Sequence, residues 1–304
     1  MKKHILRIIL ILTLISVLFS LFSCRRIDNE KKQDDTTTSA TNKDTKKITT
    51  DSLGKSDILV ETLKIGKADC IIINSKDNTV VIDAGEDDDS SAIIARLILN
   101  KVDKIDYLII THFDNDHIGA VPDILENYQV DNIIEPDYTP DEPFSDDYNA
   151  YKNALASCNS NIMTLSEDIS FTLGIMSFDI MTAKGKIYSS NIDNNSSLMI
   201  GLRHLNNSFL FAGDIEKDRI DDVVSDGIEH YDYLKVPHHG VNEKNSRSFI
   251  DAVSPKYAVI TCSEKNPPDV VLVEKLQNAG ADVYRTDNGI VYAISAEDGL
   301  TMIQ

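Results

Sequence analysis

Short runs of apolar and β-branched residues recur along the chain from residue 58 onward. Runs of this kind are typical of strands buried on both faces, and they predict strands over residues 71–74, 79–83 and 105–110. Between the last two runs, apolar residues fall on one face of a helix predicted over residues 90–101, namely Ile93, Ile94, Leu97 and Ile98.

The same alternation continues through the second half of the chain. It predicts a helix over 118–128, a strand near residue 133, a hairpin over 197–213, strands over 233–236, 257–261 and 283–285, and a helix over 269–278. Strands and amphipathic helices that alternate in both halves indicate a mixed α/β (α+β) domain in which helices pack outside two facing sheets.

The segment over residues 137–159 interrupts this alternation, because it is polar and rich in Tyr, Asp and Pro. We interpret it as an insertion, and the sequence leaves open whether it forms a lid beside a site.

The amino-terminal residues have the composition of a targeting segment. Lys2, Lys3 and Arg7 precede an apolar run over 8–22 that is short for a membrane-spanning helix. The run ends in Leu21-Phe22-Ser23-Cys24, which resembles a bacterial lipobox. We therefore expect a signal peptide over 1–23, a lipid anchor on Cys24 and a location on the extracytoplasmic face of the cell membrane. An ordinary secretory signal or an uncleaved anchor are the alternatives.

Residues 24–56 contain few apolar side chains and are expected to form a disordered tether, which leaves 57–304 as one folded domain. The formal charge of the chain is −19, and removing residues 1–23 with their three basic residues would leave −22. Such a surface repels nucleic acid unless metals or basic patches offset the charge. The remaining cysteines, Cys70, Cys158 and Cys262, are too widely spaced to indicate a disulfide framework.

The segment from Thr111 to Gly119 carries the clearest chemical signal. Directly after a predicted buried strand, it places four side chains that can bind a metal within six positions: His112, Asp114, Asp116 and His117. Adjacent carboxylates are costly to desolvate without a cation, so the cluster predicts a metal site. The alternative is a solvated acidic turn.

This segment resembles the His-x-His-x-Asp-His signature of the metallo-β-lactamase superfamily, with Asp114 at the position of the second histidine. That variant is similar to the hydrolase domain of the ComEC competence proteins. The resemblance extends to Gly66-Lys67-Ala68-Asp69, Ile82-Asp83-Ala84-Gly85, Asn194 with Ser197, Phe211-Ala212-Gly213-Asp214, Leu234-Lys235-Val236-Pro237-His238-His239-Gly240 and Tyr284-Arg285-Thr286-Asp287. It implies a four-layered αββα sandwich.

The resemblance also implies two divalent ions, zinc or manganese, and assigns their ligands. One ion would be held by Asp116, His117, Asp214 and His239, and the other by His112, Asp114 and Asp214, whose two oxygens can serve both ions. The resemblance favours His239 over His238 as the ligand and leaves His238 to contact substrate or stabilise developing charge.

Further residues have less certain roles. Asp69 and Asp83 either orient metal ligands or cap turns, and Asn194, Ser197 and Arg285 are candidates for contact with substrate or ligands. His204 and His230 lie outside the motifs and are expected on the surface.

The function expected from these features is metal-dependent hydrolysis. Two adjacent ions would deprotonate a shared water, Asp116 would orient the hydroxide, and His238 or Arg285 would stabilise the departing charge. A phosphodiester suits such a site, either in DNA or in a cell-wall polymer, and no obligate protein partner is implied. The alternatives are an amide hydrolase related to β-lactamases and a binding module without turnover.

Overall fold

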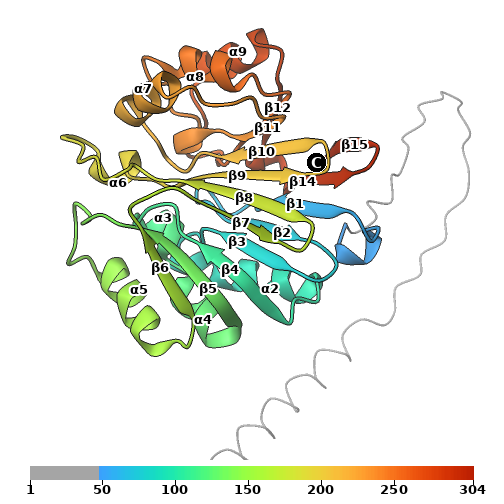
Figure 1. Ribbon diagram of the computed structural model, residues 1–304, viewed down its shortest axis with the longest axis vertical. Coiled ribbons are helices and arrows are strands. Elements are labelled where there is room, and N and C mark those ends of the chain that lie inside the picture. The colour runs from blue at the N-terminus through green and yellow to red at the C-terminus, as the bar shows by residue number, and fades with distance from the viewer. Residues whose placement is uncertain (1–47) are drawn as a thin grey trace, which may run out of the picture. The chain divides into compact units, whose positions relative to one another are not determined.

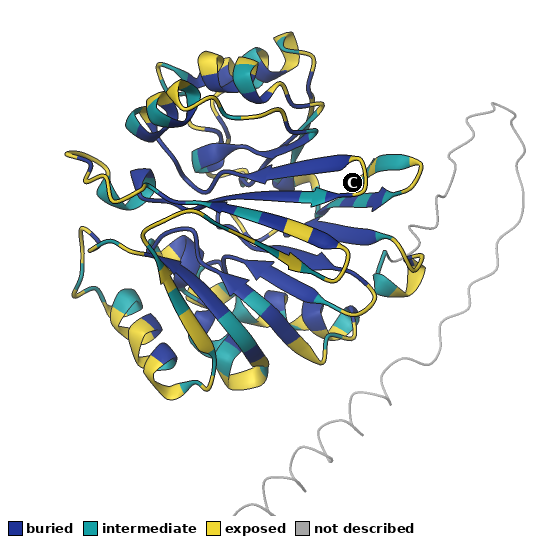
Figure 2. Ribbon diagram, viewed as in Figure 1, coloured by how far each residue is buried: buried dark blue, intermediate teal, exposed yellow. Residues whose placement is uncertain are grey.

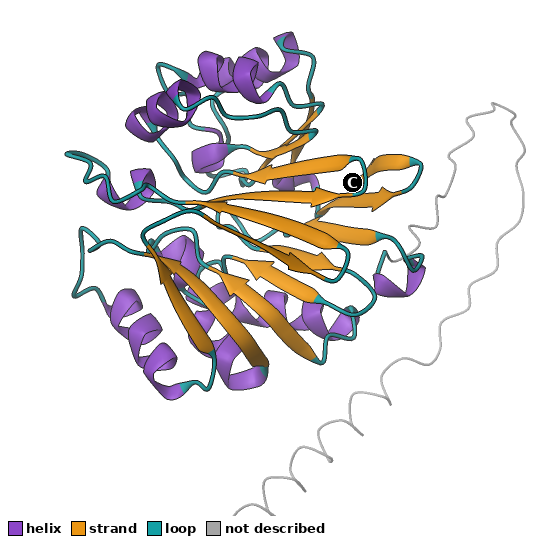
Figure 3. Cartoon of the chain, in the orientation of Figure 1, coloured by secondary structure: helices purple, strands orange, loops and turns teal. Residues whose placement is uncertain are grey.

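The computed structural model describes residues 48–304. The expectations for the signal peptide, for Cys24 and for most of the tether lie outside these residues. The described residues form two facing sheets with helices on both outer faces (Figures 1 and 3). The predicted αββα arrangement is therefore confirmed. Within the described part of the chain, no helix is long and apolar enough to cross a membrane.

The first sheet has eight strands in the order β15-β14-β1-β2-β3-β4-β5-β6. Its strands from β3 to β6 run parallel, whereas the remaining neighbours pair antiparallel. The strands span Ile58–Thr62 (β1), Ile71–Asn74 (β2), Thr79–Ile82 (β3), Lys104–Ile109 (β4), Gln129–Pro136 (β5), Asn161–Leu165 (β6), Val291–Ala296 (β14) and Gly299–Ile303 (β15).

The second sheet has seven strands in the order β13-β12-β11-β10-β9-β8-β7. The strands from β10 to β13 run parallel. Its strands span Ile169–Leu173 (β7), Met176–Met181 (β8), Met199–His204 (β9), Asn207–Phe211 (β10), Tyr233–Lys235 (β11), Tyr257–Ile260 (β12) and Asp282–Arg285 (β13). The hairpin predicted over 197–213 is formed by β9 and β10.

Helices cover the outer face of each sheet. The first sheet carries α2 (Ser90–Leu99), α3 (Asn115–Ile118), α4 (Val121–Asn127) and α5 (Asp146–Ser157), and the second carries α7 (Lys217–Ser225), α8 (Ser246–Val253) and α9 (Val270–Asn278). The short α6 (Ile192–Asn195) precedes β9. Short 3-10 helices span Thr50–Ser52 (η1), Asp87–Asp89 (η2), Pro237–Gly240 (η3) and Thr286–Asn288 (η4).

Three apolar clusters correspond to the three interfaces between these layers. Side chains such as Ile73, Ile109 and Phe178 fill the space between the sheets. Separate clusters join each sheet to its helices, and Figure 2 shows the buried strands between the exposed faces of the outer helices. This arrangement explains the predominantly apolar runs, because the central strands are covered on both faces.

Three local predictions differ from the structure. The helix predicted over 118–128 is divided into α3 and α4, and Pro122 stands in the first turn of α4, where proline is favoured. The segment over 137–159 contains α5, which buries Tyr151 and Leu155 against the sheet. The end of the predicted tether contacts the domain, because Thr50 Oγ1 donates to the carbonyl of Asn100 at 2.8 Å and Leu53 is buried.

Candidate metal centre

The predicted ligands meet where parallel strands of the two sheets end. The segment from His112 to His117 follows β4, Asp214 follows β10, and His239 follows β11. The carboxyl ends of parallel strands form a common edge, which brings loops that are distant in sequence together.

Two tight turns deliver Asp214 and His239 to this edge. Gly213 has a φ of +55°, and a Cβ atom there would lie 2.9 Å from Cβ of Ser197, so both the conformation and the space favour glycine. His238 and His239 have φ values of +48° and +52°, which are unusual for residues with a side chain. Backbone strain of this kind is concentrated at functional sites.

The ligand atoms lie close to one another. Nε2 of His239 lies 2.9 Å from Oδ2 of Asp214 and 3.4 Å from Oδ2 of Asp116. Nε2 of His117 lies 3.5 Å from the same Asp214 oxygen, and the rings of His112 and His117 are 4.0 Å apart. Asp114 stands at the exposed side, with Oδ2 3.6 Å from Nε2 of His112. All six predicted ligands are therefore gathered at one place.

Hydrogen bonds on the far side of the rings fix two of the histidines. Asp83 Oδ2 lies 2.8 Å from Nδ1 of His117, and its carboxylate also accepts hydrogen bonds from the backbone amide and hydroxyl of Thr111. Nδ1 of His239 lies 3.0 Å from Oγ1 of Thr261 and 3.5 Å from Asp69. Carboxylates that bond the outer nitrogen of a histidine direct its Nε2 toward a metal.

Asp214 is held by a lysine that sequence reasoning did not assign to the site. Nζ of Lys235 is fully buried, pairs with Asp69, and lies 3.2 Å from Oδ1 of Asp214. Oδ1 of Asp214 faces the ammonium, whereas Oδ2 faces His117 and His239. The signal was present in the sequence, because Lys235 interrupts an apolar strand.

The pKa shifts of His117 and Asp214 indicate that carboxylates outnumber positive charges at this site. Burial alone would lower the pKa of His117, but the charges of Asp214 and Asp83 raise it well above its usual value. Burial alone would raise the pKa of Asp214, yet His239, Lys235 and His117 hold it well below the usual range. Carboxylates thus draw protons onto the histidines, and bound cations would satisfy the same demand.

The residues present fit divalent ions. The buried Nε2 atoms of His112, His117 and His239 make no hydrogen bond of acceptable geometry. Buried polar atoms are rarely left without a partner, and imidazole nitrogen with carboxylate oxygen is the donor set of zinc and manganese sites. Two overlapping groups share His117: one contains His112 and Asp214, and the other Asp116 and His239.

Ser197, His238 and Asn194, the candidates for contact with substrate or ligands, lie beside different parts of the centre. Oγ of Ser197 accepts a hydrogen bond from the amide of Asp214 at 3.3 Å, so it supports the turn. Nδ1 of His238 lies 3.4 Å from Oε1 of Glu216, which also accepts a hydrogen bond from Asn194 at 2.7 Å. Asn194 therefore contacts Glu216 and belongs beside His238.

Arg285 and the two histidines outside the motifs lie apart from the ligands. The Arg285 guanidinium pairs with Asp287. The surface prediction is confirmed for His230, whose side chain is 59% exposed, and it is wrong for His204, which is 1% exposed. His204 points into the protein because Oγ of Ser295 provides a partner for its Nδ1 at 2.7 Å.

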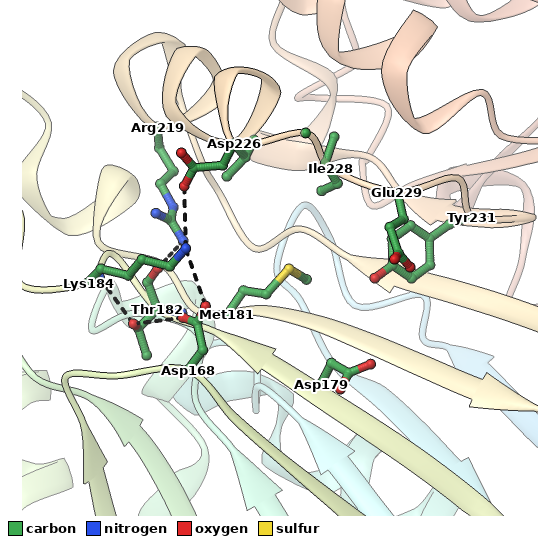
Figure 4. A pocket seen from close by; sticks show the side chains of 12 residues that line it. Asp168, Asp179, Met181, Thr182, Lys184, Arg219, Asp226, Ile228, Glu229 and Tyr231 are labelled. Carbon is green, nitrogen blue, oxygen red and sulfur yellow. Dashed lines mark hydrogen bonds and ion pairs between the residues drawn. The ribbon is translucent and has the colours of Figure 1, made fainter.

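A separate cavity of about 360 Å³ lies beside β8 and α7 and contains none of the ligands (Figure 4). Its polar groups bond one another: Lys184 lies within 3.5 Å of both Asp168 and Asp226, and the Arg219 guanidinium donates to the carbonyl of Thr182. The convergent unpartnered groups lie at the histidine cluster, which is the better candidate for chemistry.

The geometry agrees with comparisons to known proteins. The family model described as the metallo-beta-lactamase superfamily matches residues 64–263, and the chain belongs to this family. The chain is 27% identical to ComE operon protein 3 of Bacillus subtilis over 66% of its own length. That match covers 26% of the relative, so the chain spans about a quarter of its length.

Two solved structures share the fold. Igni18, a metallo hydrolase from the archaeon Ignicoccus hospitalis, aligns with a TM-score of 0.51 at 12% identity and covers 81% of this chain and 99% of that one. CmlA, a diiron β-hydroxylase from Streptomyces venezuelae, aligns with a TM-score of 0.51 at 16% identity, over 77% and 53% of the two chains. The chain is thus a metallo-hydrolase of this superfamily with a ComEC-like domain, on a fold that binds divalent metals, often two.

Proposed function

We propose that this protein is an extracytoplasmic phosphodiesterase that works with two divalent ions. The observation that carries the proposal is the position of Oδ2 of Asp214, which lies 2.9 Å from Nε2 of His239 and 3.5 Å from Nε2 of His117. A ligand atom of Asp214 also lies within 4.8 Å of one of His112, so this carboxylate adjoins ligands assigned to both ions. A pair of neighbouring ions suits a phosphodiester, because its attacking and leaving oxygens both gain negative charge.

The candidate ligands would have separate roles in binding the two ions and orienting the attacking water. By the family resemblance, His112, Asp114 and Asp214 would hold one ion, and Asp116, His117, Asp214 and His239 the other. When bound, the ions supply a nucleophile at neutral pH by lowering the pKa of water, and they neutralise the phosphoryl charge. Asp116 would accept a hydrogen bond from the attacking water and so orient it.

His238 is the proposed partner of the leaving group. Its side chain is a quarter exposed, and the carboxylate of Glu216 lies 3.4 Å from Nδ1, which orients the ring. Asn194 donates a hydrogen bond of 2.7 Å to the same oxygen of that carboxylate. Nε2 of His238 would then interact with the departing oxygen. Arg285, paired with Asp287, has no assigned contact in this scheme.

Asp114 influences the choice of metal. A carboxylate at a position where the superfamily signature has histidine makes that ion site richer in oxygen, which favours manganese or mixed occupancy with zinc. The proposed substrates are a cell-wall phosphodiester or DNA, reached from a lipid anchor on Cys24. The anchor is tested by Cys24→Ala, which should release the chain from the membrane fraction, whereas retention there would contradict it.

The experiment that tests the function compares two substrate classes. The full chain, purified in mild detergent and freed of metal, is reloaded with manganese or zinc and assayed on bis(p-nitrophenyl) phosphate and nitrocefin. We expect faster turnover of the phosphodiester, and Asp116→Ala serves as the blank for contaminating enzymes. Faster nitrocefin turnover with both metals, abolished in the blank, would establish the amide-hydrolase alternative. Inactivity on both, and on single-stranded DNA, would favour the binding-module alternative.

A further inference from the structure

Lys67 lies at the exposed side of the metal centre, in the loop between β1 and β2. Its side chain is 42% exposed, yet Nζ turns inward to 2.8 Å from Oδ2 of Asp116. The same oxygen lies 3.4 Å from Nε2 of His239. A flexible cation therefore stands directly beside atoms that fit a metal ion.

The loop that carries Lys67 is fixed to the centre by its backbone. The amide of Asp69 donates to the carbonyl of Asp116 at 3.1 Å, and the carbonyl of Asp69 accepts from the amide of Gly85 at 2.9 Å. The Cα atom of Lys67 is thus held two residues away from these anchors. The ammonium group can therefore move at the site only by rotation of the four-carbon side chain.

Lys67 differs from the other lysine at this centre because its side chain is partly exposed to solvent. Among the lysine and arginine side chains in residues 48–304, two pair with the candidate ligand carboxylates, Lys67 with Asp116 and Lys235 with Asp214. Lys235 is fully buried and is committed to Asp69 and Asp214. Lys67 alone of the two can reach a molecule that enters from solvent.

A metal ion held by Asp116 would compete with Lys67 for the same carboxylate. Like charges repel, so the ammonium would turn from Asp116 toward the nearest anion. When a phosphodiester is bound at the ions, its non-bridging phosphoryl oxygens, which carry the negative charge, offer the ammonium such a partner.

We propose that Lys67 binds a non-bridging oxygen of the phosphodiester and makes the site selective for anionic over neutral phosphate esters. This inference rests on the proposed phosphodiesterase function. Lys67 is then a specificity-determining residue, which acts on the charge of the substrate while the ions activate water.

The test uses two esters that share a leaving group, bis(p-nitrophenyl) phosphate and its neutral methyl ester. With the full chain loaded with manganese, Lys67→Met should lower kcat/KM for the anionic diester about 10- to 100-fold, the range expected for loss of a hydrogen bond to a charged group. Activity on the neutral triester should fall by less than about threefold. Lys67→Arg should retain most of the preference for the diester.

Lys64→Met is the matched control, because Lys64 is an exposed lysine in the same loop that donates to the carbonyl of Asp287 at 2.7 Å. It should leave both activities unchanged. Equal losses on the two esters in Lys67→Met, or a loss of bound manganese measured by elemental analysis, would overturn the proposal, because either result indicates a role in the metal site itself.

Binding of inorganic phosphate separates this inference from the proposed function. Calorimetric titration of the manganese-loaded chain with phosphate should show affinity weakened in Lys67→Met and unchanged in Lys64→Met. If the wild-type chain hydrolyses neither ester, the phosphodiesterase proposal fails while the phosphate titration still tests anion binding by Lys67. Unchanged phosphate affinity in Lys67→Met would overturn the inference.

Discussion

Replacing Lys235 by methionine tests whether the buried ammonium is needed to hold two carboxylates inside the protein. Nζ of Lys235 contacts Asp69, Oδ1 of Asp214 at 3.2 Å and the carbonyl of Gly213 at 3.1 Å, and its side chain has no exposed surface. Methionine is a flexible, uncharged side chain that fills irregular core space, so the change removes mainly the charge.

The expected loss is large because both partners stay buried. Removing one member of a buried ion pair leaves the other charge uncompensated and costs about 3–5 kcal/mol. Asp69 and Asp214 are 1% and 3% exposed, so solvent offers little relief. At about 2–4 °C per kcal/mol for a domain of this size, the midpoint of thermal unfolding should fall by roughly 6–20 °C.

The assay is urea and thermal unfolding of the full chain in the presence of a chelator, so that bound ions do not replace the lost charge. Lys184→Met is the matched control, because Lys184 also lies between two aspartates but is 48% exposed. Exposed pairs contribute about 0–1 kcal/mol. A loss in Lys235→Met that is no larger than in this control would refute the assignment of Lys235 as the counterion of both carboxylates.

Two further predictions concern the metal and the effect of pH. Asp214→Ala should lose both ions, measured as metal per chain, because Asp214 adjoins ligands assigned to each ion. Asn194→Ala should keep both ions, because Asn194 contacts Glu216. Two ions retained in Asp214→Ala would contradict this assignment. Burial lowers the pKa of His204 below 6.5, so the unfolded chain takes up a proton before the folded one does, and folding stability should be lost as pH falls from about 6.5 toward the folded pKa. The midpoint of unfolding should fall less over this pH range in His204→Gln than in the wild type. His230→Gln, which changes an exposed histidine, should match the wild type. Identical pH dependence of stability in both variants would rule out the role of His204.

The fold could be predicted where strands are buried on both faces. Strands β2, β3 and β4 are mostly apolar because helices cover one face and the opposite sheet covers the other. Strands β6 and β7 escaped prediction because they alternate between partly buried and exposed residues at sheet edges, where the apolar signal is weak.

The candidate ligands could be predicted because their signals are local. His112 to His117 form one motif after one strand, and Asp214 and His239 each follow a recognisable strand and turn. The contacts around them are not local: Lys235 meets Asp69 across more than half of the folded chain. Hydrophobic periodicity places Lys235 in a strand but does not indicate which carboxylate it will pair with, since register between distant strands is decided by packing.

The net charge of the whole chain does not predict the charge of the metal centre. A formal charge of −19 suggests that the protein repels anionic substrates. The centre itself gathers five carboxylates, Asp69, Asp83, Asp114, Asp116 and Asp214, against the ammonium groups of Lys67 and Lys235, which leaves an excess of three negative charges. That excess accounts for the raised pKa of His117 and His239. Two divalent ions would reverse the local sign to one net positive charge, so the same carboxylates that make the empty centre repel a phosphodiester would make the loaded centre attract it.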